Sequence, residues 1–270
     1  MLSHYSSAGL LALALAAAAP AMAADNATSL STLEFKNRFR ASGIVPEILP
    51  AALDPSVSFY ASYVRTGHGN ELILPGASLT VSEADLPFEF SVENLNNGTN
   101  VTANSRFLIY LLDADAPSRN NPTARNLRHY LAGNYTASGT TSQVLSTAQR
   151  LTIPTGQFRP FTSFIKPAPT ANTGVHRYIF ALYTQPARYN NAGFESAGQE
   201  ASIENWNLTQ WRTQLGLGPA IGATYFTIDT GANGGQGTSG NVPAGNGAAG
   251  VAVPVCMAAL AAVLGFAALL

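Results

Sequence analysis

The chain has a single cysteine and only two lysines. Cys256 lies in the apolar C-terminal tail, which leaves the rest of the chain without a disulfide framework or a pair of thiolates for a metal. Apart from Lys36 and Lys166 the cations are arginines, and 14 Lys and Arg residues face 15 Asp and Glu residues. Such a balanced chain lacks the basic face that binds nucleic acid. We therefore expect no nucleic-acid partner.

The N-terminus has the pattern of a secretory signal peptide over residues 1–23. An apolar run from Leu10 to Ala19 precedes Ala21-Met-Ala23, which fits small-x-small cleavage. A transmembrane anchor is the alternative, but the run is too short and too rich in alanine for it. We expect export, with the folded domain spanning residues 24–229.

The C-terminus has the pattern of a GPI-attachment signal. Residues 230–250 are rich in Gly, Asn, Ala and Ser and carry no charge, so they predict a flexible stalk. Residues 251–270 are apolar to the end, and a small-residue site, a polar spacer and such a tail direct lipid attachment. Asn246 and Ser239 are the candidate attachment residues. A tail-anchored helix is the alternative.

Asn-x-Ser/Thr sequons agree with export, since each is an acceptor for N-glycosylation in a secreted chain. Asn97 and Asn100 fall in an expected loop, where glycans fit, whereas Asn207 falls in an expected helix and suits a glycan least. The five sequons are Asn26, Asn97, Asn100, Asn134 and Asn207.

The strand pattern predicts a mainly β domain. Residues 57–63 and 88–93 alternate apolar with polar side chains, which predicts strands with one buried and one wet face. Residues 107–112 are apolar throughout and predict a strand buried on both faces. Residues 175–183 and 224–228 are further β-rich runs.

Few helices are expected. Ser31 and Glu34 form a capping box that predicts a helix ending near Gly43. The segment 44–48 is expected to be extended, because a residue before proline avoids the helical region. An apolar stripe predicts a second helix over 202–215. Many strands with a few peripheral helices predict an antiparallel β-sandwich.

Three short stretches beside these strands carry the chemistry: residues 113–119, 128–130 and 174–178. A carboxylate at the end of a buried strand, Asp113, is costly unless it is hydrogen bonded or functional. His176 and Tyr178 share one face of a strand, so Arg177 points away from them. A nearby carboxylate favours charged imidazoles, so His129 and His176 are expected to donate to an anion.

The turn after Asp113 is expected to be rigid and self-contained. Pro117 fixes its backbone, and Asp115 and Arg119 are spaced for a local ion pair. We expect Asp115, Ser118 and Arg119 to have structural roles.

These stretches resemble the phosphatidylethanolamine-binding protein family, in which a D-P-D-x-P-S-R loop, a later histidine and a G-x-H-R-Y strand line one pocket. The resemblance covers roughly residues 30–229 and implies a β-sandwich around a small anion pocket. Pro169 resembles the family's proline-rich pocket wall, whereas Ala114 and Leu127 depart from its usual proline and aromatic residue. The matching residues are Asp113, Asp115, Pro117, Ser118, Arg119, His129, Gly174, His176, Arg177 and Tyr178.

The resemblance implies a binding protein rather than an enzyme. We expect a secreted, GPI-anchored, fungal-type member at the cell surface that binds a phosphate or phospholipid headgroup, with no cofactor and no metal. The implied ligand contacts are Asp113, His129, His176, Tyr178 and Pro169.

Four other functions stay open. The first is an inhibitor of serine-type peptidases, similar to carboxypeptidase Y inhibitor, which would act through a surface outside the pocket. The second is a hydrolase using Ser118, His129 and Asp113, although the serine lacks a G-x-S-x-G elbow. The third is a metal-dependent enzyme with Asp113, His129 and His176 as ligands. The fourth is a purely structural, glycosylated wall protein.

Overall fold

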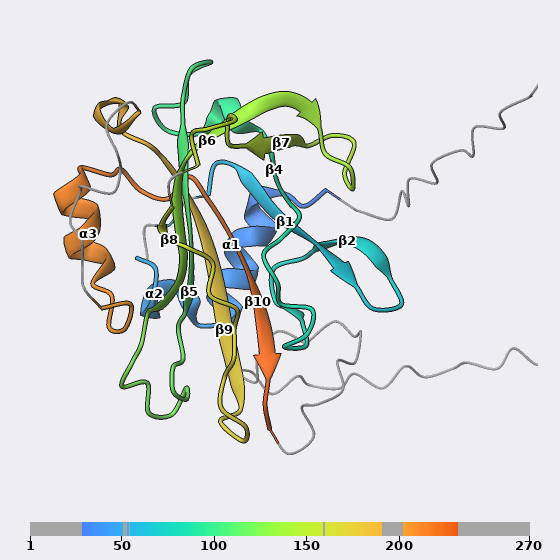
Figure 1. Cartoon of the computed structure of the whole chain (residues 1–270), viewed down its shortest axis with the longest axis vertical. Helices are drawn as coiled ribbons and strands as arrows, with labels where there is room; N and C mark the ends of the chain where they lie inside the picture. Colours follow the sequence, from blue (N-terminus) through green and yellow to red (C-terminus); the bar gives the residue numbers. More distant parts are fainter. Residues whose placement is uncertain (1–28, 51–52, 54, 159, 191–201, 232–270) are drawn as a thin grey trace, which may run out of the picture.

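The computed structural model describes residues 29–50, 53, 55–158, 160–190 and 202–231. Within them, strands predominate and helices are few and short (Figure 1). The helices are α1 (Thr32–Ala41), α2 (Ile44–Glu47), η1 (Leu95–Asn97), η2 (Ala187–Tyr189) and α3 (Leu208–Leu215). The strands are β1 (Ser58–Arg65), β2 (Gly69–Ile73), β3 (Ala77–Ser78), β4 (Glu89–Glu93), β5 (Phe107–Asp113), β6 (Leu127–Thr141), β7 (Gln149–Thr152), β8 (Pro160–Thr162), β9 (Val175–Thr184) and β10 (Gly222–Asp229).

The strands form one sheet that curls until it nearly closes. Their order is β2-β1-β4-β7-β6-β5-β9-β10-β3, and β8 pairs with β6. The chain just before β1 reaches the chain just before β10, because the amides of Ser56 and Val57 both donate to the carbonyl of Ile221, at 3.1 and 3.0 Å. The mainly β class with few helices is confirmed, and the finer description as a sandwich stays a prediction.

The inside of the curled sheet is an aromatic and aliphatic core. Phe90 of β4 packs against Phe180 of β9 with ring centroids 5.2 Å apart, and Tyr63 of β1 packs against Phe226 of β10 at 5.9 Å. Neither pair lies on adjacent strands, so both contacts cross the interior. Burial of such rings is the main source of stability in a domain of this size.

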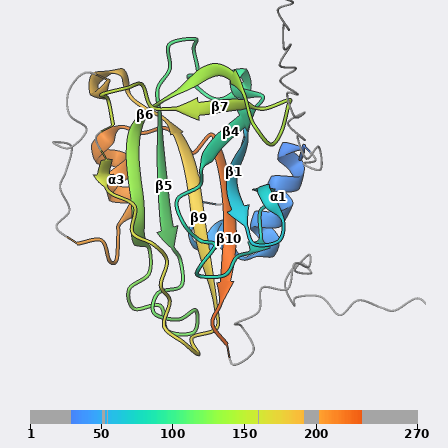
Figure 2. The ribbon, with the colours of Figure 1, turned by 45° about the vertical axis from the view of Figure 1, so that its right-hand side comes forward.

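Helices cover the outer face of the sheet, with α1 beside β1 and α3 beside β5 and β6 (Figure 2). The prediction of a wet face on β1 and β4 is therefore wrong. Tyr60 packs against Phe35 of α1 at 5.5 Å and donates to Glu93 Oε2 at 2.6 Å. Both strands are buried almost throughout. The double burial predicted for residues 107–112 is confirmed.

The helix predictions hold in part. Ser31 caps α1 by accepting from the Glu34 amide, and Gly43 follows it with φ 74°. The segment 44–48 is a short helical turn rather than extended, and only Val45 keeps extended angles. The second helix begins at Leu208 instead of residue 202, because the Asn207 side chain accepts from the Gln210 amide and caps it there.

Several predictions fall outside the described residues: the signal peptide, most of the stalk, the C-terminal tail, Asn26, Ser239 and Asn246. Among the described residues no helix is long and apolar enough to cross a membrane.

Gly222 allows β10 to approach β1 closely. A Cβ at this position would lie 2.9 Å from Phe59 Cβ and 3.1 Å from the Val57 carbonyl oxygen. We expect Gly222→Ala to lower the free energy of unfolding by about 1–3 kcal/mol, because overpacking a rigid core forces backbone shifts. Gly218→Ala is the matched control, since nothing lies within 4 Å of its Cβ. Urea unfolding that shows equal stability for the two variants would contradict this account.

Candidate functional site

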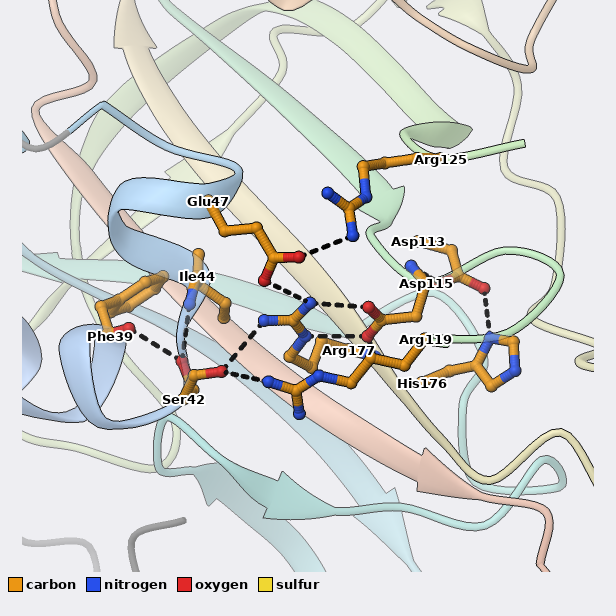
Figure 3. Close-up of polar contacts among 10 residues, drawn as sticks. All are labelled: Phe39, Ser42, Ile44, Glu47, Asp113, Asp115, Arg119, Arg125, His176 and Arg177. Carbon is orange, nitrogen blue, oxygen red and sulfur yellow. Dashed lines mark hydrogen bonds and ion pairs between the residues drawn. The ribbon is translucent and has the colours of Figure 1, made fainter. Parts of the chain in front are cut away.

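Asp113 and His176 form a buried pair at one end of the curled sheet. Asp113 ends β5 and His176 is the second residue of β9, and the two residues are only 2% and 1% exposed. His176 Nδ1 lies 2.8 Å from Asp113 Oδ2, and Asp113 Oδ1 accepts from the Asp115 amide at 2.7 Å (Figure 3). The cost of burying the carboxylate is thus offset by two hydrogen bonds.

The other ring nitrogen of His176 is also engaged. Nε2 lies 2.8 Å from the Thr173 hydroxyl, which itself donates to the Thr170 carbonyl at 2.6 Å. Thr173 belongs to the turn before β9, where Gly174 takes φ 84°. A ligand oxygen at Nε2 would have to replace the threonine hydroxyl.

His129 reaches the site because of a β-bulge. In the pairing of β5 with β6, Leu111 faces Tyr130 and Leu112 faces Arg128, so His129 is the extra residue between them. A bulge re-aims a side chain that regular alternation would place elsewhere. His129 packs edge-on against Tyr178 at 5.4 Å, while Arg128 lies over the Trp206 ring on the outer face.

The protonation of His129 follows from its contacts. Nδ1 lies 2.8 Å from the Ile165 carbonyl oxygen, which only accepts, so Nδ1 carries a proton. Nε2 is buried and has no hydrogen-bond partner. Burial lowers the pKa of His129, although the Ile165 carbonyl and the charge of Asp113 oppose the shift. Asp113 thus favours the charged form of His129, as expected, but burial outweighs this effect and the net pKa is lowered.

Tyr178 lies between the two histidines. It is stacked on Phe226 at 5.1 Å and nearly parallel to His176 at 6.4 Å. Burial, and next the negative charge of Asp113, raise the pKa of its hydroxyl. The hydroxyl therefore stays protonated, and it forms no hydrogen bond of standard geometry.

Arg177 points to the face of β9 opposite to that of His176 and Tyr178, as the alternation predicts, and donates to Asp115 (Figure 3). Its Nε and Nη2 donate to the two Asp115 oxygens at 2.8 and 2.6 Å, and Nη2 also donates to Glu47 Oε2 at 3.0 Å. Burial alone would lower the pKa of Arg177, but Asp115 and Glu47 raise it.

The predicted ion pair of Asp115 with Arg119 is therefore wrong. Arg119 is exposed and donates to the Ser42 carbonyl at 3.1 Å, and Arg177 Nη1 reaches the same oxygen at 3.0 Å. These contacts fix the loop after β5 to the turn between α1 and α2.

The remaining predicted residues lie around this end of the sheet. Pro169 is half-buried in the segment before Thr173, and Ser118 is half-buried in the loop after Asp113. Among the described residues, no hydrogen bond joins Ser118 to His129 or Asp113, so the hydrolytic triad is not assembled. No cluster of three or more His, Cys, Asp or Glu that could hold a metal ion occurs in the described part of the chain.

Sequence reasoning missed three contacts of the site: the Thr173 hydroxyl, the Ile165 carbonyl and the Glu47 carboxylate. Thr173 lies only three residues before His176, so the turn before the strand could have indicated this contact. Ile165 lies 36 residues from His129 in the sequence and contacts it through a backbone carbonyl. Glu47 lies 130 residues from Arg177 and reaches it from the short helix α2.

Comparison with known proteins defines the class. The profile of the phosphatidylethanolamine-binding protein family matches residues 67–226. The chain belongs to this family, and the motif resemblance is confirmed at that level.

A sequence relative is the 26 kDa secreted antigen of Toxocara canis, 27% identical over 194 residues, which cover 70% of this chain and 62% of the antigen. The chain thus spans less than two thirds of that relative.

Two solved structures share the fold. Carboxypeptidase Y inhibitor, solved in complex with its cognate proteinase, superposes with a TM-score of 0.57 at 17% identity, covering 73% of this chain and 95% of the inhibitor. The phosphatidylethanolamine-binding protein of Plasmodium vivax gives 0.52 at 15% identity, covering 71% and 95%.

Proposed function

We propose that this family member is a binding protein whose site for a small anion is formed by Asp113, His129, His176 and Tyr178. The observation that carries the proposal is the buried Nε2 of His129, which has no partner although it lies beside the buried, hydrogen-bonded pair of Asp113 and His176. A buried polar atom without a hydrogen bond is costly and is more common at functional sites. Pro169 is proposed as part of the wall.

The ligand chemistry follows from the hydrogens available. Protonation of His129 at Nε2 would turn an acceptor into a charged donor, and the Tyr178 hydroxyl is a second donor. His176 Nε2 becomes a third if the ligand replaces Thr173. Three donors on rings that contact one another fit the oxygens of a phosphate or of a phospholipid headgroup, which share this chemistry.

Anion binding is expected to strengthen as the pH falls. The pKa of His129 lies below its usual 6.5 in the free protein, and a bound anion raises it, so binding takes up a proton. Affinity therefore increases as pH falls from the bound-state pKa to the free-state pKa, by up to about tenfold per pH unit for one proton.

Calorimetric titration with sulfate tests this, because sulfate keeps its charge between about pH 5 and 8, where histidine titrates. His129→Gln retains a hydrogen-bonding group without a titratable charge, so its binding should lose the pH slope. A wild-type affinity that is flat across this range would refute the role of His129.

We also propose that the protein is exported and anchored at the cell surface by GPI, as a fungal-type member. The secreted nature of the Toxocara relative supports export, and the terminal sequence patterns support the anchor. Phosphatidylinositol-specific phospholipase should release the protein from intact cells. Retention after treatment would favour a tail helix in the membrane.

Inhibition of a serine-type peptidase is the second candidate, favoured by the fold shared with carboxypeptidase Y inhibitor. Inhibition would use a surface outside the anion site. The full chain should then slow a serine carboxypeptidase, and a variant with Asp113→Asn and His129→Gln should slow it equally. We propose neither catalysis nor a cofactor for this chain.

A further inference from the structure

A cavity of about 520 Å³ lies at the other end of the same strands. It lies where β5 begins and β9 ends, at the upper end in Figure 1, whereas Asp113 and His176 lie at the opposite ends of these strands. Its volume is within the range of small-molecule sites. Its lining includes Asn100, Thr102, Asn104, Arg106, Gln185 and Pro186.

The lining has a distinct chemistry. Amide and hydroxyl side chains dominate, and Pro, Ala and Gly supply the apolar part, while the described lining contains no acidic and no aromatic residue. Arg106 is the single cation, and its Nη1 already donates to Asn134 Oδ1 at 3.2 Å and to Gln157 Oε1. Neutral donors and acceptors beside small apolar surfaces suit a sugar ring, which has a hydroxyl edge and a C–H face.

The cavity contains a sequon of the chain itself. Asn100 and Thr102, the first and third residues of Asn-Val-Thr, both line it, and Asn100 is exposed in a turn with φ 61°. We propose that Asn100 carries an N-linked glycan whose first N-acetylglucosamine lies in this cavity. The proposal rests on the export proposed above.

Asn134 is the contrasting sequon. Its Nδ2 donates to the Gln157 carbonyl at 3.3 Å, and its Oδ1 accepts from Arg106 and, at 3.0 Å, from Gln185 Nε2. A glycan on Nδ2 would break this network, which also positions Gln185 in the cavity wall. Asn134 is therefore unmodified in the folded protein, although its sequon is as good as that of Asn100.

The test uses the full chain in a eukaryotic host, placed behind a leader that is known to direct export. Mass spectrometry of glycopeptides reads each site separately. Asn97→Gln removes the neighbouring sequon, which lies outside the cavity lining, and Asn100→Asp removes the proposed site while keeping a residue that tolerates positive φ. The expected result is a glycan on Asn100 and none on Asn134.

Cleavage of the Asn100 glycan by an N-glycosidase tests whether its first sugar lies in the cavity. The Asn100 glycan should be released from the native Asn97→Gln protein at least roughly tenfold more slowly than from the denatured protein, a difference of about 1.4 kcal/mol in protection. Equal rates, an unmodified Asn100, or a glycan on Asn134 would overturn the proposal. If Asn100 carries a glycan only when the added leader is present and not with the chain's own N-terminus, the export proposal is contradicted while the cavity assignment is supported.

Discussion

Replacing Arg177 with methionine lowers the free energy of unfolding by about 3–5 kcal/mol, the usual cost of breaking a buried ion pair. The reason is that Asp115 is completely buried and receives two hydrogen bonds from the guanidinium. Methionine fills much of the volume but leaves the charge of this carboxylate without a counter-ion, with only the backbone amide of residue 177 still donating to it. Chemical unfolding of the two proteins at neutral pH measures the difference.

Arg119→Met is the matched control. Arg119 donates to the same Ser42 carbonyl as Arg177 but is exposed and has no carboxylate partner among its hydrogen bonds, so its replacement should change stability by only about 0.5 kcal/mol. The double variant Asp115→Leu with Arg177→Met should recover much of the loss, since no charge is then stranded. Equal losses for the two arginine variants would contradict the assignment.

Replacing His129 with leucine weakens sulfate binding at pH 6 by roughly ten- to a hundredfold, because a hydrogen bond to a charged group contributes about 1.5–3 kcal/mol. Leucine removes the Nε2 donor and leaves the neighbouring His176, Tyr178 and Asp113 in place. Calorimetric titration of the wild type and the variant gives the ratio of affinities.

Two further variants separate the causes. His68 lies in the exposed turn between β1 and β2, so His68→Ala should bind sulfate like the wild type at every pH. His129→Gln should bind with intermediate affinity, since it restores a donor without the charge. Full binding by His129→Leu would show that the anion, if bound, sits elsewhere.

The sequence predicted those parts of the fold that depend on local pattern. The apolar run of β5 has no polar position, and it is buried throughout. The capping box at Ser31 makes the expected hydrogen bond. Both features depend on residues close together in the chain, where spacing determines geometry.

Features that depend on elements far apart in the chain could not be predicted from the sequence. The alternation of residues 57–63 predicts that Tyr60 faces solvent, whereas in the structure α1 covers it. The spacing in the sequence predicts an ion pair of Asp115 with the nearby Arg119, but the pairing of Asp113 with Tyr178 in adjacent strands brings Arg177 to Asp115 instead. The β-bulge that directs the His129 side chain toward the site has no sequence signal, because it is a difference in register between β5 and β6.

Nitrogen NMR of the histidine rings in the full-length protein tests the central claim most directly. The site described here predicts that His129 at pH 7 is neutral with its proton on Nδ1, since that atom faces the Ile165 carbonyl. Addition of inorganic phosphate or phosphoethanolamine should protonate Nε2 and shift its signal to that of a charged imidazole. A His129 spectrum that is unchanged at saturating ligand would contradict the anion site.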